Sequence, residues 1–449
     1  MPTNRITYGQ TAIAVSPSPS NQTNTNNLTG LKRVQSASVD FSFAEQRYKQ
    51  IGSDAFIGQI PIQNSNIGLD LSYFYSNGTN EAIIGLDVNS EQGSLLNYVQ
   101  KQGQDRNYYI LLGTGENQEA NKTDENIDFK NKFNVMALGN VFLNSYNFSA
   151  SIGSIPSIST SLSAYNVVVS QYNDITNGEV IPAINTSTTP AEPVLNQNYK
   201  LYPEVFKNTT NRDGNIHSAF SVGDIKLTLA DVKEPGVQFT GTNPATSATI
   251  QSLDFGFEIS REDLYGLGSM YPYGRRAQLP VLGSLSFSAL ATDLTSGNLD
   301  AFLTGDHQYD FMFDLVDHCS GLTGLRIYVD QAQMTSESLS SNIGSDAQVN
   351  IEFDFSISTQ SGLRFGTPPL IVNQPAATAS AGDTLYVQPT GKTSAGATYN
   401  ADGFKYQWYG TGGTVGSNQR SHVAAVAGDY YVVVSNELGS ATSNTCVVS

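Results

Sequence analysis

The stretch "IQSLDFGFEISREDLYGLGS", residues 250–269, has a counterpart much earlier in the chain. That counterpart is "VQSASVDFSFAEQRYKQIGS", residues 34–53, and the two align without a gap at a constant offset of 216. The identical positions are Gln35 with Gln251, Ser36 with Ser252, Phe41 with Phe257, Gly52 with Gly268, and Ser53 with Ser269. A pattern carried twice predicts one structural unit that is built twice.

Weaker matches follow in the same order along both halves of the chain. They pair "YGQTAIAV" (8–15) with "VGDIKLTL" (222–229), "GSLLNYV" (93–99) with "GNLDAFL" (297–303), "YYILL" (108–112) with "YDFMFDL" (309–315), and "SIGSIPSIS" (151–159) with "NIGSDAQVN" (342–350). We therefore expect four regions: a first repeat at 1–170, an extended connector at 171–218, a second repeat at 219–362, and a separate module at 366–449. The connector is rich in Asn, Thr and Pro, which is typical of an extended segment.

Hydrophobic periodicity within the repeats predicts an all-β fold. Apolar residues alternate with polar ones in "VDFSFAE", "LDFGFEIS" and "VNIEFDFSIS", which is the pattern of half-buried strands. The exceptions are 93–99 and its copy 297–303, where apolar residues spaced i, i+3, i+4 predict one short helix per repeat. We expect each repeat to be a β-sandwich or an open barrel that carries this helix.

The charge balance excludes several classes of function. The chain has 449 residues, with 40 acidic and 23 basic side chains and a formal net charge of −17. Such a surface repels DNA phosphates, so it would let DNA pass nearby without holding it.

The two cysteines, Cys319 and Cys446, do not form a disulfide framework. We see no signal-peptide pattern and no run of about 20 apolar residues that could cross a bilayer, and we expect a soluble product made in a cytoplasm.

Two adjacent basic residues, Arg275 and Arg276, stand out in this acidic chain. We interpret "YPYGRR" (271–276) as part of a three-residue insertion that distinguishes the second repeat. The long polar loop at 113–133 carries the acidic residues Glu116, Glu119, Asp124 and Glu125. Our hypothesis is that copies of the protein form stacked rings and that the two arginines contact these acids in a neighbouring ring. The alternative is two solvated arginines on a loop. Other candidate arms are the segment 16–30 and the connector.

The search for catalytic chemistry gives one candidate metal cluster. "DLVDHC" brings together Asp314, Asp317, His318 and Cys319. The equivalent place in the first repeat has no such cluster, so the alternative is an ordinary strand end followed by a turn. No phosphate-binding loop and no nucleophile–base pattern is present in the sequence. We therefore predict that the protein is not an enzyme and needs no cofactor.

The module at 366–449 resembles an immunoglobulin-like domain. The resemblance rests on "AGDTLYV", "FKYQWYG" and "GDYYVVVSNELGSATS". It implies that Trp408 is the buried strand-C tryptophan and Tyr430 the tyrosine-corner residue. It also implies that Val387 and Val432 stand where the family carries its cysteine pair, so that packing alone holds this core.

The whole arrangement resembles the tail tube proteins of long-tailed bacteriophages, in the branch with a duplicated tube domain. The resemblance implies that three subunits form a ring with pseudo-sixfold symmetry and that the rings stack into a hollow tube for DNA passage. It further implies a virion protein, made in the host cytoplasm, whose partners are its own copies and other tail proteins such as the terminator, the distal tail or baseplate, and the tape measure. The C-terminal domain would face outward, where weak contact with glycans or a host surface is possible.

Two alternatives stay open at this point. A terminator or baseplate ring protein would share the same fold. A virion decoration or adhesin that binds cell-surface glycans would share the C-terminal domain but would not need the doubled unit.

Overall fold

The computed structural model describes more than half of the chain. The described residues are 11–15, 29–42, 45–61, 66–75, 79–86, 105–113, 133–172, 181–185, 192–196, 225–233, 250–268, 272, 274–290, 308–317, 323–340, 348–357, 362–366, 369, 371–389, 404–436 and 439–449. They are nearly all β-strand, as the sequence predicted, with one short helix, α1 (Thr79–Ile84). The two helices predicted at 93–99 and 297–303 lie outside the described residues.

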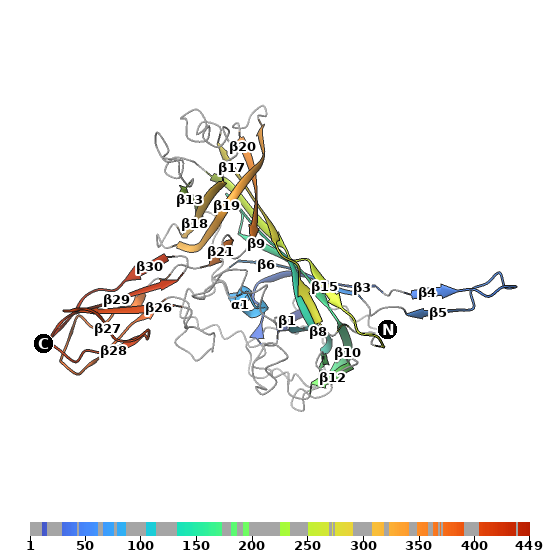
Figure 1. Ribbon diagram of the computed structural model, residues 1–449, viewed down its shortest axis with the longest axis horizontal. Helices are drawn as coiled ribbons and strands as arrows, with labels where there is room; N and C mark the ends of the chain where they lie inside the picture. The colour runs from blue at the N-terminus through green and yellow to red at the C-terminus, as the bar shows by residue number, and fades with distance from the viewer. Residues whose placement is uncertain are drawn as a thin grey trace.

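A single 15-stranded sheet forms the body of the molecule (Figure 1). Its first group of strands is β1 (Thr11–Val15), β2 (Thr29–Gly30), β3 (Val34–Ser42), β6 (Asn66–Phe74), β7 (Arg106–Gly113), β8 (Phe133–Ser151), β9 (Ser157–Ala164) and β10 (Asn166–Tyr172). Its second group is β13 (Ile225–Lys233), β14 (Ile250–Glu258), β17 (Val281–Leu290), β18 (Gln308–Asp317), β19 (Thr323–Ser340), β20 (Gln348–Ile357) and β21 (Leu363–Gly366).

The two groups have the same pairing order. The first runs β3-β6-β9-β8-β7-β1, with β10 also on β8, and the second runs β14-β17-β20-β19-β18-β13, with β21 also on β19. Their irregularities coincide as well. A register shift at Val34/Ser36 matches one at Ile250/Ser252, and a shift at Leu143/Ser145 matches one at Met334/Ser336. The correspondence therefore reaches the level of single bulges, which are specific local features of a sheet.

The pairing register contradicts the three-residue insertion expected around 271–276. Hairpin β4 (Glu45–Tyr48) with β5 (Gly58–Pro61) pairs its ends Glu45 and Pro61. Hairpin β15 (Arg261–Leu264) with β16 (Gly274–Ala277) pairs Arg261 with Ala277, so the offset is 216 at both ends of the hairpin. The strands after the hairpins, β6 and β17, keep the same offset, and the insertion prediction is wrong.

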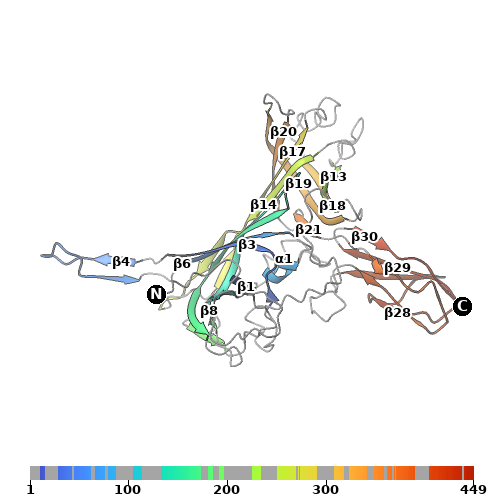
Figure 2. The same ribbon diagram turned by 180° about the vertical axis from the view of Figure 1, so that it is seen from behind.

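The hairpins leave the sheet as separate two-stranded ribbons. Figures 1 and 2 show β4–β5 as a long arm that projects from the body. Gly52 and Gly268 occupy the matching tip positions with φ of 92° and 87°, a left-handed conformation that glycine adopts without strain. In the segment expected to be an extended connector, β11 (Ile181–Asn185) pairs with β12 (Glu192–Asn196) as a further hairpin.

One hydrophobic core runs under the whole body sheet. The alternation predicted from the sequence is seen in β20, where Val349, Ile351, Phe353 and Phe355 are buried and their neighbours are exposed. Helix α1 packs on this core through Ile83 and Ile84.

The C-terminal module has its own core and its own sheets. Its strands are β22 (Ile371–Asn373), β23 (Thr378–Ala379), β24 (Thr384–Tyr386), β25 (Gln388–Pro389), β26 (Lys405–Gly410), β27 (Gly413–Val415), β28 (Ser421–Val423), β29 (Gly428–Asn436), β30 (Gly439–Thr442) and β31 (Cys446–Val448). Figures 1 and 2 both show this module on the side of the body opposite the β4–β5 arm.

Candidate assembly surfaces

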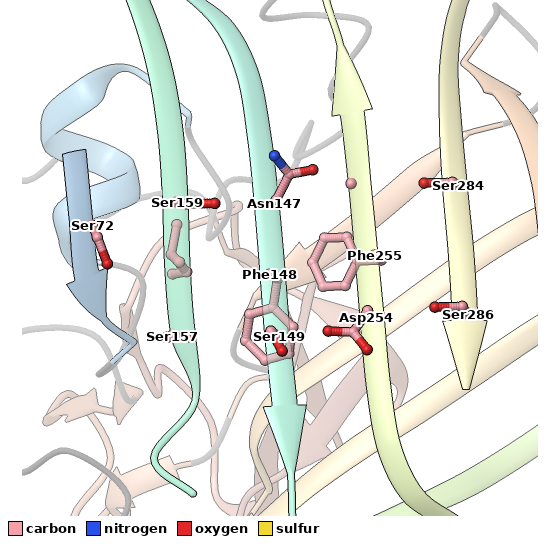
Figure 3. A pocket seen from close by; sticks show the side chains of 12 residues that line it. Ser72, Asn147, Phe148, Ser149, Ser157, Ser159, Asp254, Phe255, Ser284 and Ser286 are labelled. Atoms are coloured by element: carbon pink, nitrogen blue, oxygen red, sulfur yellow. The ribbon is translucent and has the colours of Figure 1, made fainter. Parts of the chain in front are cut away.

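The outward face of the body sheet is a field of small polar side chains. Figure 3 shows adjacent strands presenting Ser72, Ser159, Asn147 and Ser284 in one row, and Ser149, Asp254 and Ser286 in the next. The hollow over these residues encloses about 190 Å³, which is below the roughly 300–1,000 Å³ typical of small-molecule sites. The face is therefore a broad surface rather than a ligand pocket.

This polar face is also acidic. Its outward-pointing positions on β3, β6, β14 and β20 include the exposed carboxylates Asp40, Asp70, Asp254, Glu258, Glu352 and Asp354. On those four strands, and on β9, β17 and residues 145–151 of β8, no outward-pointing position holds Lys or Arg. The face thus presents negative charge next to serine and asparagine, a combination that repels a polyanion.

An internal joint connects the two groups of strands edge to edge. Strand β14 pairs with β8 from Ser252 opposite Ser151 to Glu258 opposite Ser145. Beneath this ladder the ring of Phe257 stacks on Tyr146, with centroids 5.5 Å apart and planes 12° apart. Aromatic pairs at this spacing stabilise a contact beyond the free energy gained by burial alone, so this stack stabilises the joint between β8 and β14.

A cluster around Arg275 locks the β15–β16 hairpin onto the first group of strands. The Arg275 guanidinium forms an ion pair with Asp263 and donates to Ser163 Oγ at 2.8 Å. It also lies 4.3 Å from the ring centroid of Tyr165 and 5.0 Å from that of Phe142. We call these five residues the arginine clasp. Its arginine is stacked as well as ion-paired, which suits the planar guanidinium.

The row of strands that carries the acidic face, β3-β6-β9-β8-β14-β17-β20-β19, ends in two open edges. Among the described residues, β3 pairs only with β6, and the C-terminal part of β19 (334–340) pairs only with β20. The apolar side chain of Phe41 on β3 is 42% exposed, whereas Phe257, its counterpart on β14, is 2% exposed because β8 covers it. An exposed edge of this kind is a template for pairing with another strand.

The two hairpins carry exposed apolar side chains. On the β4–β5 arm these are Tyr48, Ile51, Phe56, Ile57 and Ile60. On the β15–β16 hairpin, Tyr265 and Leu267 are exposed, and Leu267 stands at the position equivalent to Ile51. Clustered apolar groups of this kind mark interaction surfaces.

The residues predicted to bridge neighbouring rings have mixed placements. Arg275 is committed to the clasp within its own chain, with only 10% of its side chain exposed. Arg276, the next residue on β16, is exposed. The acids Glu116, Glu119, Asp124 and Glu125 lie outside the described residues. Sequence reasoning missed Asp263, although opposite charges placed across a hairpin could have indicated it.

The candidate metal cluster is only partly described. Asp314 forms an ion pair with Arg326, with Nε 2.7 Å from Oδ1, on neighbouring strands. The backbone of Asp317 ends β18, while His318 and Cys319 lie outside the described residues. No group of three or more potential metal-ligating side chains is found in the described part of the chain. That part also has no helix that is long and apolar enough to span a bilayer.

The predicted core residues of the C-terminal module lie together in one cluster. Trp408, Val387 and Val432 are fully buried, and Tyr430 is nearly so. The Tyr430 hydroxyl donates to the Val426 carbonyl at 2.8 Å, a bond to backbone a few residues upstream that is typical of a tyrosine corner.

A buried carboxyl lies under the first group of strands. Glu81 on α1 accepts hydrogen bonds from the hydroxyls of Tyr73 (3.0 Å) and Tyr146 (3.3 Å). Burial raises the pKa of the Glu81 carboxyl to about 7, because removal from water disfavours the charged form. No sequence pattern indicates this residue, because a helix of six residues is too short to show a helical period.

Comparison with known proteins gives structural matches only. No protein-family model matches the chain, and no curated protein matches its sequence. Among solved structures it is similar to the SPP1 tail tube, with 12% identity, a TM-score of 0.26, and coverage of 38% of this chain and 81% of that one. It is also similar to the PVC sheath/tube terminator of an extracellular contractile injection system, with 13% identity, a TM-score of 0.26, and coverage of 38% and 99%. A third is "Tandem Ig repeats of Dlar", with 12% identity, a TM-score of 0.14, and coverage of 31% and 86%.

Proposed function

We propose that this protein is a structural subunit of a bacteriophage tail tube, in which each chain contributes two tube units. The observation that carries the proposal is the acidic, base-free sheet face, bounded by two open edges in a chain that already contains one edge-to-edge joint. Three chains would join head to tail into a ring, and rings would stack into a hollow tube. The four regions 1–170, 171–218, 219–362 and 366–449 serve as first tube unit, connector, second tube unit and C-terminal domain.

Ring closure follows from repeating the same joint. A head-to-tail contact between unlike surfaces closes into a ring when its rotation is a simple fraction of a turn. The β8–β14 joint is such a contact inside one chain, because it uses the C-terminal half of β8 on one side and β14 on the other. The free surfaces of the same kind are β19 and β3, so each chain can accept one neighbour at each end.

The polar face suits the lining of a DNA channel. In a closed ring built through these edges, one sheet face points inward, and the apolar face is already covered by the core. Carboxylates without lysine or arginine repel phosphates, so DNA would slide through without binding. No cofactor and no catalytic step is part of this function.

The other surfaces suit the remaining contacts of a tail. Exposed apolar residues on the hairpins offer contacts between stacked rings and to other tail proteins, such as a terminator, a baseplate component or a tape measure. The C-terminal domain, with its separate core, would decorate the outside of the virion and provide any weak contact with a host surface or glycan.

The edge-to-edge assembly is tested by blocking one edge. Phe41→Lys places a charge on the open edge strand β3, where the side chain is exposed in the single chain, so folding should be retained. Val423→Lys, on a similarly exposed strand position of the C-terminal domain, is the matched control. We expect wild type and Val423→Lys to form rings or tubes in sedimentation velocity, and Phe41→Lys to stay monomeric. A monomeric wild-type protein would overturn the proposal.

A further inference from the structure

The internal joint specifies the register of the contact between chains. We propose that β3 of one copy pairs with β19 of its neighbour so that Asp40 lies opposite Ser338, and that the β4–β5 hairpin clasps the neighbour's β20 through Arg47 and Asp354. The inference rests on the proposed head-to-tail assembly and adds its partner, its register and its charge pair.

The register comes from strand equivalences that the bulges fix. The offset between β3 and β14 is 216. The offset between β8 and β19 is 191, because the shift at Leu143/Ser145 on the β9 side recurs at Met334/Ser336 on the β20 side. In the internal joint Gly256 lies opposite Asn147. The equivalent residues are Asp40 and Ser338.

Side-chain size supports this register. A Cβ atom added at Gly256 would lie 2.2 Å from Asn147 Oδ1, so the internal joint has room for one large side chain at this pair. Between chains the large residue is Asp40 and the small one is Ser338. The pair therefore keeps one larger and one smaller residue, with the larger one on the other strand. Both positions are exposed in the single chain.

The arginine clasp has a counterpart in which the positive group stands on the other strand of the hairpin and the negative group stands on the sheet. By the same equivalences, Arg47 takes the position of Asp263, Gln59 that of Arg275, and the neighbour's Asp354 that of Ser163. Arg47 is exposed on the projecting arm, and Asp354 is exposed on β20. A positive group on the hairpin thus meets a negative group on the sheet. Complementary charge of this kind favours the correct partner and register.

Cysteine cross-linking tests the register. Asp40→Cys with Ser338→Cys, in a background that lacks Cys319 and Cys446, places two thiols directly opposite one another if the register is right. The matched control is Ser38→Cys with Ser338→Cys, which lies two residues off on the same face at roughly 7–8 Å, beyond the reach of a disulfide. On oxidation of assembled protein we expect a ladder of covalent multimers for the first pair and only monomer for the second. A ladder from the control pair alone would overturn the register. The absence of a ladder from both pairs would overturn it as well.

Charge reversal tests the clasp. Arg47→Glu or Asp354→Lys alone should raise the concentration needed for assembly about tenfold, because each places like charges together. The double variant should recover most of that loss, whereas Arg47→Glu combined with Asp70→Lys should not. Equal effects in both double variants would overturn the clasp.

These outcomes separate the inference from the proposed function. If wild-type protein assembles but Asp40→Cys with Ser338→Cys does not cross-link, the register is wrong and the tube subunit stands. If wild-type protein does not assemble, the proposed function has failed and this inference fails with it.

Discussion

Asn140 and Gln331, 191 positions apart, have the same left-handed backbone conformation, with φ of 51° and 55°. The backbone N–H of Asn140 donates to Asn107 Oδ1 at 3.0 Å, and the backbone N–H of Gln331 donates to Asp310 Oδ1 at 2.9 Å. Both lie where the long central strand shifts register against the strand before it. The two groups of strands are therefore bent in the same way, by a bulge whose backbone N–H donates to one side-chain oxygen.

Replacing Gln331 with glycine should stabilise the protein or leave its stability unchanged. A non-glycine residue at positive φ costs of the order of 1 kcal/mol, which glycine relieves. Gln333→Gly is the matched control on the same strand and should destabilise by about 1 kcal/mol, because its backbone is ordinary strand. Urea unfolding of both variants measures the difference. Equal destabilisation would show that the conformation at Gln331 carries no strain.

Stability should fall as pH rises through the range set by Glu81. Its pKa is raised to about 7 in the folded state, whereas it is about 4.3 in an unfolded chain. Between these values the folded state holds a proton that the unfolded state has lost. The contribution of this carboxyl therefore declines from about pH 4.3 to pH 7 and is constant above that range.

Glu81→Gln should remove this slope, since the amide keeps an acceptor for Tyr73 and Tyr146 without ionising. Thermal unfolding at pH 5 and pH 8 measures it, with the exposed Glu262→Gln as control. We expect wild type and Glu262→Gln to lose more stability than Glu81→Gln over this range. Identical pH dependence in all three proteins would contradict the assignment.

The equivalent phenylalanines Phe257 and Phe41 should respond differently to truncation. Phe257→Ala should destabilise the single chain by about 3–5 kcal/mol, because it empties a buried site that is stacked on Tyr146. Phe41→Ala should cost under about 1 kcal/mol in the single chain, since its side chain is partly exposed. Denaturant unfolding below the assembly concentration measures both, and similar losses would contradict the difference in burial.

Removing the C-terminal module should leave assembly intact. The chain should be cut after Gly366, because β21 pairs with β19 and belongs to the body. The module has a core of its own, so its loss should not open the body sheet. Sedimentation velocity of the truncated protein should show the same rings or tubes as the full chain. A truncated protein that stays folded and monomeric would show that the module takes part in assembly.

The sequence predicted the class of fold and aligned β3 with β14 at the offset that their pairing registers share, but it did not show which edges stay open. Alternation placed Phe41 and Phe257 on equivalent strands, and only the pairing shows that β8 covers Phe257 and leaves Phe41 exposed. Compensating sizes hide much of the repeat from alignment. Ile67 lies opposite Ala164 in the first group, and the equivalent pair in the second is Gly283 opposite Phe355. Volume is kept while residue identity is lost.

The parts of the site that were not predicted from the sequence are contacts between residues far apart in the chain. Arg275 was predicted to contact a neighbouring ring because it stands beside Arg276 in an acidic chain. No local pattern connects it with Tyr165 and Phe142, which lie more than 100 positions away. Glu81 was missed because its helix is too short to show a period, and because its partner Tyr146 lies 65 positions away on β8.

Electron microscopy of the purified full-length protein, with its mass measured in solution, tests the tube assembly directly. We expect end-on views with three chains per ring, six similar lobes around a central hole, and side views of stacked rings. Single closed rings that never stack would retain the edge pairing and contradict the tube. A monodisperse monomer at every concentration tested would show that the two open edges, β3 and β19, do not pair between copies.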